Sequence, residues 1–359
     1  MRASITLTGP CRLGYSFDPV LPLPRDALRI APRFAGVCGT DLDIIRRTRG
    51  DMPSVLGHEV VAEVTESDIH GVDGRIVVVN PVSDNDQRRN FGHSIPGVWT
   101  KQRIVTSSEI ADGHLAYWPS QDVGPESALG EPVGAAVYAR ALMQLNARAP
   151  AQVLILGSGG IALTLAIVLT RDGHAVTLSP SCPEHAAQLD GVLEGCPRLR
   201  IVPRADLGRS GLRADAAAVM VSRGGCRAAV SQALGVLKPG GILDLVSSVD
   251  PGPSPACHRL NFNKLAEIRW HNTRGNPVAG AYLDGEGPNG PYRVTGQRGT
   301  SAGHIAAAME LIGANRAAFR KILSHVVPFE EAVAFIEAVA RDRAARIDGR
   351  IVTKAVIAF

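Results

Sequence analysis

The sequence predicts an α/β protein in which a β-rich first part is followed by a doubly wound parallel sheet. Its 359 residues exceed what one ordinary core needs, so two domains are expected. Before residue 130, short β-branched runs such as VVAEV (60–64) and RIVVV (75–79) are separated by Gly, Pro and Asp. After residue 151, apolar strands alternate with helical segments, which is the pattern of a parallel sheet covered by helices on both faces.

The first strand of this sheet is expected at VLILG (153–157), because a continuous apolar run is typical of a strand buried on both faces. Further strands are expected at AVTLS (175–179), RIV (200–202), AAAVMV (216–221), GILDLVSS (241–248) and the closing IVTKAVIAF. Helices are expected at 160–171 and near 184–194, 225–236, 302–313 and 329–340. Residues 275–296 are dense in Gly and Pro, so we expect mostly loop there, of a length typical of lids and interfaces. A ligand cleft is expected between the two domains.

Composition and charge exclude several classes of function. The formal charge of +4 is small, and Arg and Lys are scattered, which favours anionic small ligands over nucleic acid. The N-terminus lacks the apolar core of a signal peptide, and the longest apolar stretch, 161–169, is about half of what a bilayer requires. The six cysteines are dispersed with no C-x-x-C pair, which predicts the reducing cytoplasm and excludes a four-cysteine zinc site.

A glycine-rich turn follows the first strand of the predicted parallel sheet. Residues 157–162 read G-S-G-G-I-A and match G-x-G-x-x-G/A at the start of a helix. Gly157 permits the tight turn, Gly159 lets backbone N–H groups approach a pyrophosphate, and the small Ala162 allows close helix packing. A bare match of this kind also fits a turn without a ligand, but its strand–helix setting favours a dinucleotide site formed by Gly157, Ser158, Gly159, Gly160 and Ile161.

The end of the second strand bears on the choice of cofactor. The acidic residue that binds the ribose hydroxyls of NAD is expected about 20 positions after the turn. The sequence has Ser179-Pro180-Ser181 there instead, with His185 close by. No carboxylate repels a 2′-phosphate, and the hydroxyls of Ser179 and Ser181 could hydrogen-bond to it. NADP is therefore favoured, and NAD stays open.

Two short motifs in the first part carry metal-ligand chemistry, GVCGTD (36–41) and GHEV (57–60). The thiolate of Cys38, the imidazole of His58 and the carboxylate of Glu59 are a suitable zinc set, and catalytic zinc keeps one position open for water or substrate. A lone cysteine is usually a small buried residue, and a lone histidine is usually structural. Their combination with a dinucleotide turn favours a catalytic metal.

Together with GEPVGAAVYA (130–139) and the closing ILSHVVPFEEA…RIVTKAVIAF, these motifs resemble the medium-chain dehydrogenase/reductase family nearly end to end. The pattern is most similar to its zinc-containing sorbitol (polyol) and threonine dehydrogenase branches. The resemblance implies a GroES-like catalytic domain (1–131 and 298–359) and a Rossmann cofactor domain (132–297). It implies hydride transfer between NAD(P) and a secondary alcohol or ketone on a polyol, sugar, cyclitol or amino-alcohol substrate. It also implies a homodimer or homotetramer.

The resemblance also assigns roles to residues of the metal site. Cys38 and His58 correspond to zinc ligands. Glu59 and Glu131 correspond to carboxylates of the metal site, and which of them binds zinc directly stays open. Asp41 corresponds to the carboxylate that orients the histidine ligand.

Other assignments concern proton transfer and the cofactor. Thr40 corresponds to the hydroxyl that relays the substrate proton. Asp43 stands where a relay histidine often stands, so the last proton transfer would use Asp43, the cofactor ribose or water. Lys354 corresponds to a basic residue near the cofactor pyrophosphate, and Thr295 lies in a stretch expected to pass the nicotinamide.

The segment after Asn80-Pro81 departs from the family. VSDNDQRRNFGHSIPG has no cysteine, so we expect one catalytic zinc per chain and no structural zinc. His93 and His114 are expected to be structural or surface residues. The alternatives are a zinc-independent quinone or enoyl-type reductase of the same superfamily, or a non-catalytic dinucleotide-binding relative, and both classes usually lack the metal set.

Overall fold

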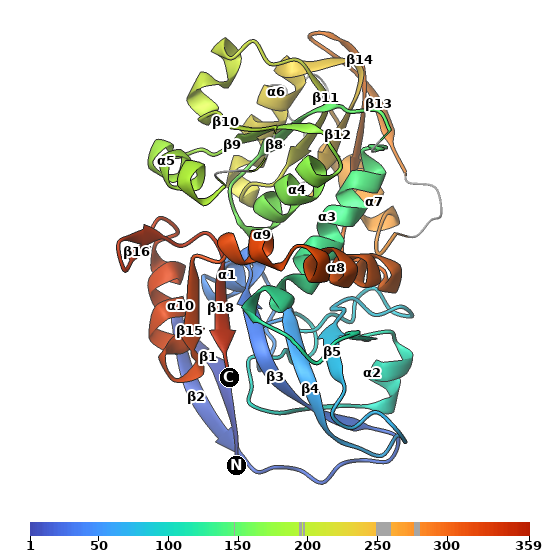
Figure 1. Ribbon diagram of the computed structural model, residues 1–359, viewed down its shortest axis with the longest axis vertical. Coiled ribbons are helices and arrows are strands. Elements are labelled where there is room, and N and C mark those ends of the chain that lie inside the picture. The colour runs from blue at the N-terminus through green and yellow to red at the C-terminus, as the bar shows by residue number, and fades with distance from the viewer. Residues whose placement is uncertain (147, 194–195, 197, 249–259, 276–280) are drawn as a thin grey trace. The chain divides into compact units, whose positions relative to one another are not determined.

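The computed structural model describes residues 1–146, 148–193, 196, 198–248, 260–275 and 281–359. The chain forms two compact units, which we call the first unit (Met1–Gly134 with Thr300–Phe359) and the second unit (Ala135–Gly299). Helix α3 (Gly130–Leu142) begins in the first and ends in the second (Figure 1). Among the described helices, none is long and apolar enough to cross a bilayer.

The first unit is built on a sheet of order β15-β18-β3-β4-β5-β7, with β6 pairing to β3. The strands of this sheet are β3 (Leu28–Val37), β4 (Val60–Ser67), β5 (Ile76–Val79), β6 (Arg103–Val105), β7 (Leu115–Tyr117), β15 (His325–Pro328) and β18 (Ala355–Ala358). Two further two-stranded sheets belong to this unit, β1 (Arg2–Gly9) with β2 (Arg12–Asp18) and β16 (Arg346–Ile347) with β17 (Arg350–Ile351). Its helices are α1 (Gly39–Ile45), α2 (Ser107–Ala111), α8 (Ala302–Ala314), α9 (Arg316–Lys321) and α10 (Ala332–Arg341), with 3₁₀ turns η1 (Pro125–Leu129) and η4 (Phe329–Glu331).

The two β-branched runs of the sequence explain the centre of this sheet. VVAEV lies in β4 and RIVVV supplies β5, and Val61 pairs with Val78 across the two strands. These strands contribute fully buried valines to a core that also holds Trp99 and Phe91. β-Branched side chains pack well on such a pleated, buried surface.

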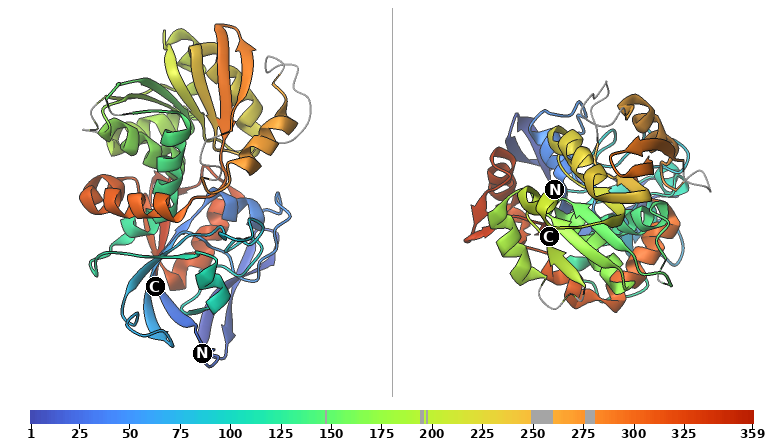
Figure 2. Two further views of the ribbon diagram at one scale, coloured as in Figure 1. Left: turned by 90° about the vertical axis from the view of Figure 1, so that its right-hand side faces the viewer. Right: turned by 90° about the horizontal axis from the view of Figure 1, so that it is seen from above.

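The second unit is a sheet of order β10-β9-β8-β11-β12-β14-β13, in which every neighbouring pair is parallel except β13–β14. Its strands are β8 (Gln152–Leu156), β9 (Ala175–Ser179), β10 (Leu199–Ile201), β11 (Ala214–Val219), β12 (Leu237–Leu245), β13 (Leu283–Gly287) and β14 (Gly290–Gly296). Its helices are α4 (Gly160–Arg171), α5 (Pro183–Val192), α6 (Cys226–Val236) and α7 (Phe262–His271), with η2 (Arg204–Arg209) and η3 (Arg223–Gly225). Helices lie on both faces of this sheet (Figure 2), so the predicted doubly wound architecture is confirmed.

The prediction of mostly loop over 275–296 is wrong where the structure describes it; residues 276–280 lie outside the described residues. β13 and β14 form an antiparallel hairpin at the sheet edge. The reason lies in Tyr292, which is 4% exposed and covers Gly285 and Gly287 so closely that a Cβ at either glycine would lie within 3.2 Å of its ring. These glycines give the strand room for a buried aromatic ring, although they look like loop residues in the sequence.

Helix α7 was not predicted, because its residues show only a weak apolar pattern. Its N-terminus is nevertheless specified locally, since the side chain of Asn261 accepts hydrogen bonds from the N–H groups of Asn263 and Lys264. Asparagine is among the strongest N-cap residues.

Candidate functional site

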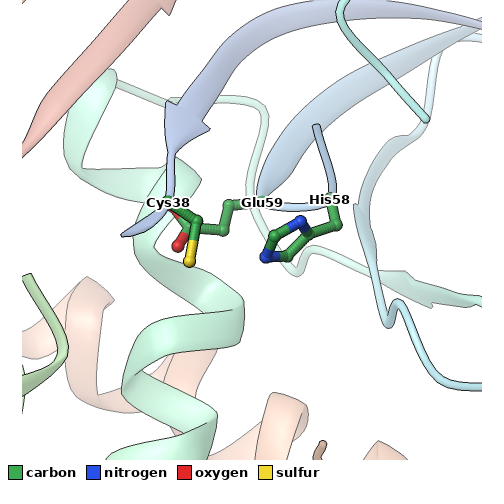
Figure 3. Close-up of side chains that lie close together, drawn as sticks. All are labelled: Cys38, His58 and Glu59. Atoms are coloured by element: carbon green, nitrogen blue, oxygen red, sulfur yellow. The ribbon is translucent and has the colours of Figure 1, made fainter. Parts of the chain in front are cut away.

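Three side chains of the first unit converge where β3 ends and β4 begins. Cys38 follows β3 and caps α1, and His58 and Glu59 directly precede β4. Because β3 and β4 are antiparallel neighbours, the two segments meet, and the Gly36 N–H donates to the Glu59 carbonyl at 2.8 Å. The potential ligand atoms of Cys38, His58 and Glu59 lie within 4.8 Å of one another (Figure 3). We call these three residues the metal cluster.

Asp41 fixes the orientation of His58. Its side chain is fully buried; one carboxylate oxygen accepts a hydrogen bond from the Cys38 N–H at 2.9 Å, and the other lies 3.4 Å from Nδ1 of His58. A carboxylate at this position favours the tautomer with its proton on Nδ1, which leaves Nε2 for a metal. Burial alone would lower the pKa of His58, but the Asp41 carboxylate raises it well above its usual value. Surroundings that favour a proton on His58 also favour a metal cation there.

Lys354, which the resemblance places near the cofactor pyrophosphate, lies beside the metal cluster. It is 4% exposed, and its ammonium forms an ion pair with the Glu59 carboxylate and donates to the Val37 carbonyl at 3.2 Å. Burial alone would lower the pKa of Lys354, but Glu59 raises it above its usual value. Because a buried cation needs a partner, the ammonium lies against Glu59 within the first unit.

Glu131 at the start of α3 faces the same charges. Burial raises its pKa to about 7, His58 opposes the shift, and Glu59 adds to it. A carboxyl group with such a pKa exchanges a proton readily near neutral pH. Glu131 therefore belongs to the electrostatic environment of the metal cluster, although it is not one of the three converging residues.

Helix α1 carries the two residues assigned to proton transfer. Thr40 is half-buried in its first turn, two residues after Cys38. Asp43 forms an ion pair with Arg343, so its carboxylate is already engaged. A proton route through Asp43 would have to compete with this ion pair.

His93 lies beside the metal cluster but is not one of the three converging residues. The centroids of the His93 and His58 rings are 4.9 Å apart. Burial, reinforced by His58, lowers the pKa of His93 to about 3, so its imidazole is neutral at physiological pH. Neither spacing nor periodicity marks it, and the only local signal is the flanking Gly92. His114, in contrast, is buried with Nδ1 2.8 Å from the Asn80 carbonyl oxygen, which is a structural position.

The segment without cysteines is held by hydrogen bonds. Ser83 Oγ accepts from the N–H groups of Asn85 and Asp86 at 3.1 and 3.0 Å. Ser94 Oγ accepts from the Asn90 N–H at 2.9 Å and donates to the Arg88 carbonyl at 2.5 Å. These contacts give the segment a defined conformation without thiolate ligands.

The glycine-rich turn of the second unit has the geometry of a pyrophosphate site. Gly157 has φ +140°, and a Cβ there would lie 2.2 Å from the Met220 carbonyl oxygen, so glycine is required. Gly159 is exposed, and a Cβ there would meet no atom within 4 Å. Helix α4 begins at Gly160, directly after this open space, and its free N–H groups favour an anion. Ser158 Oγ lies 3.0 Å from Nδ1 of His185 on α5, which ties the turn to the end of β9.

The other residues assigned to the cofactor differ in their burial and in their hydrogen bonds. Ser179 is fully buried, and its hydroxyl has no hydrogen-bond partner among the described residues. Ser181 is exposed and directly precedes Cys182, the N-cap residue of α5. Ile161 is half-buried in α4. Thr295 is fully buried, and its hydroxyl donates to Ala281 at 2.8 Å and accepts from Asn272 at 3.0 Å. Both hydrogen bonds engage the Thr295 hydroxyl within the second unit; that this stretch passes the nicotinamide stays a prediction.

Comparison with known proteins agrees with this arrangement. Residues 24–112 match the family described as the alcohol dehydrogenase GroES-like domain. The first unit contains an alcohol dehydrogenase GroES-like domain. This domain carries the metal cluster, Asp41 and His93. No curated protein matches the sequence.

Several solved structures share the fold of the whole chain. A zinc-binding dehydrogenase of Sinorhizobium meliloti 1021, determined with NADP bound, has a TM-score of 0.75 at 17% identity over 100% of this chain and 99% of its own. 2R,3R-Butanediol dehydrogenase of Bacillus subtilis has a TM-score of 0.74 at 17% identity over 100% of both chains. L-Idonate 5-dehydrogenase of Escherichia coli K-12 has a TM-score of 0.73 at 16% identity over 100% and 98%. The resemblance to medium-chain dehydrogenases is thus confirmed for the GroES-like domain and for the fold, without distinguishing the sorbitol and threonine branches.

Proposed function

We propose that this protein is a zinc-dependent oxidoreductase that transfers a hydride between NADP or NAD and a secondary alcohol or the matching ketone. The observation that carries the proposal is the convergence of Cys38, His58 and Glu59 in a GroES-like domain. A glycine turn of dinucleotide-binding geometry on the same chain supports it. Thiolate, imidazole and carboxylate together are a donor set that zinc prefers.

The residues of the first unit have distinct tasks in this proposal. Zinc held by Cys38, His58 and Glu59 would supply Lewis-acid polarisation of the alcohol or ketone oxygen. Asp41 keeps the His58 ring in the tautomer that a metal needs. Thr40, two residues after Cys38, is the hydroxyl proposed to pass on the substrate proton. Because Asp43 is paired with Arg343, water or the cofactor ribose is the favoured final acceptor.

The second unit would hold the nicotinamide dinucleotide, which supplies or accepts the hydride. We propose that its pyrophosphate lies at Gly159 and the start of α4, where the backbone is open. NADP is favoured because β9 ends in Ser179, whose buried hydroxyl has no partner in the part of the chain that the structure describes, and because Ser181 is exposed. No carboxylate at that point of the sequence repels a 2′-phosphate.

We further propose that the substrate is a polyol, sugar, cyclitol or amino alcohol, on the resemblance of Glu131 to the glutamate of polyol dehydrogenases. A homodimer or homotetramer is proposed on the resemblance to the family, and the cytoplasm is proposed from the dispersed cysteines. The five described cysteines are all free, as a reducing compartment favours.

The test is a panel of polyols, secondary alcohols and ketones, assayed with NAD and NADP in parallel on protein whose zinc content is measured. We expect about one zinc per chain, turnover with NADP exceeding turnover with NAD, and loss of both zinc and turnover in C38A and H58A. Full activity in zinc-free protein would refute the proposal.

One observation favours the alternative of a zinc-independent reductase of the same superfamily. The Lys354 ammonium already neutralises Glu59, which reduces the negative charge offered to a metal. Under this alternative the protein would contain no stoichiometric zinc and would reduce a quinone or enoyl substrate. Zinc analysis of the purified protein separates the two candidates.

A further inference from the structure

The segment from Gly92 to Trp99 packs closely on Gly57, the residue that precedes His58. Gly92 has φ +70°, and a Cβ there would lie 2.6 Å from the Gly57 carbonyl oxygen; a Cβ at Gly97 would lie 2.2 Å from the same oxygen. The Trp99 ring covers Gly57 so closely that a Cβ there would lie 2.2 Å from it, and the indole N–H donates to the Gly36 carbonyl at 3.2 Å. Backbone packing therefore brings the His93 backbone close to His58.

The His93 imidazole has a free hydrogen-bonding capacity at this position. The ring is half-buried and tilted by 59° against His58 at a centroid distance of 4.9 Å. Among the described residues, neither of its nitrogens has a hydrogen-bond partner, and neither is sealed from solvent. His93 also stands outside the three residues whose ligand atoms converge. A half-buried imidazole without a partner among the described residues, beside a metal-ligand set, is suited to bind a polar group of a substrate.

We propose that His93 hydrogen-bonds a second polar group of the substrate, so that the site prefers vicinal diols and 2-amino alcohols over monoalcohols. The inference rests on the proposed function. The His93 ring lies beside the ring of a metal-cluster residue, and the proposal therefore assigns the group that it binds to a carbon next to the reacting one. A substrate without that group leaves the imidazole unpaired in a partly desolvated site, and this lowers its binding.

The test compares 2,3-butanediol with 2-butanol, which differ only in the second hydroxyl group, in the zinc-loaded protein and the variants H93F and H93N. H93F keeps a ring against His58 but has no ring nitrogen, whereas H93N restores a hydrogen-bonding group. The exposed His70, changed to Phe, is the matched control. Turnover, equilibrium binding of both alcohols without cofactor, and zinc content are measured for each protein.

We expect the unmodified protein to prefer the diol in kcat/KM and in binding. H93F should lower both for the diol on the order of tenfold, with 2-butanol, zinc content and H70F nearly unchanged, and H93N should recover most of the loss. Equal losses with both alcohols, loss of zinc in H93F, or no preference for the diol in the unmodified protein would overturn the proposal. If zinc is bound but neither alcohol is oxidised, the proposed function fails; unchanged diol binding in H93F then overturns the role of His93 separately.

Discussion

Replacing Asp41 by Asn tests the role of this carboxylate in preparing His58 for a metal. Asp41 is fully buried, accepts from the Cys38 N–H at 2.9 Å and lies 3.4 Å from His58 Nδ1. In D41N the amide oxygen can keep the bond to Cys38, but the amide NH₂ group then faces Nδ1 and favours the tautomer with its proton on Nε2. Loss of such a partner weakens metal binding about 10- to 100-fold. This is about 1.4–2.8 kcal/mol of binding free energy.

The assay is the zinc Kd of the purified metal-free protein, measured by competition with a chelator of known affinity. D43N is the matched control, because Asp43 lies in the same helix but pairs with Arg343 at a position where its side chain is 28% exposed. Partly exposed ion pairs contribute about 0–1 kcal/mol to stability, so D43N should bind zinc nearly as the unmodified protein does. Equal zinc affinity in D41N and D43N would refute the role assigned to Asp41.

Three further predictions concern the two units separately. K354M leaves the buried Glu59 carboxylate unpaired and should lower the unfolding free energy of the metal-free protein by about 3–5 kcal/mol. The double variant K354M/E59L should recover most of this loss. A loss below about 1 kcal/mol for K354M in denaturant titrations would contradict the prediction. G157A should lower the free energy of unfolding by at least about 1–3 kcal/mol, because Gly157 has φ +140°. G159A should keep the thermal stability and lose NADP affinity, because a Cβ at Gly159 meets no protein atom within 4 Å. A stable G157A together with an unstable G159A that still binds NADP would contradict the roles assigned to the two glycines. Burial raises the pKa of Asp244 to about 7 from 3.8. Between these pH values the folded state binds more protons than the unfolded state, so the free energy of unfolding falls as the pH rises, by about 4 kcal/mol at most. Urea titrations at pH 5 and pH 8 should show this fall in the unmodified protein and not in D244N.

Local patterns could be read from the sequence because neighbouring residues determine them. The strand, turn and helix around Gly157 depend on an apolar run, a required positive φ and a helix start, all within about 20 residues. The metal cluster could be predicted because its two motifs are short and chemically distinctive. The hairpin β13–β14 could not, because its glycines serve the packing of Tyr292, a contact that composition does not reveal.

The remaining parts of the candidate site depend on contacts between distant residues. Lys354 and Glu59 are 295 positions apart, and no local pattern around Lys354 indicates that its ammonium is buried. His93 reaches His58 only because Gly92 and Gly97 pack on Gly57. A sequence without aligned relatives offers no covariation from which such pairs could be inferred, so these residues emerge only from the three-dimensional arrangement.

The pairing of β18 with β3 has a consequence for biosynthesis. Ala355 pairs with Val37, which places Lys354 beside the end of the strand that leads to Cys38. Cys38, His58 and Glu59 leave the ribosome long before residue 354, so the nascent chain exposes a thiol, an imidazole and an uncompensated carboxylate for most of its translation. Glu59 gains its ion pair with Lys354 only once β18 has been synthesised, so a metal captured earlier would bind a site that lacks this counter-charge.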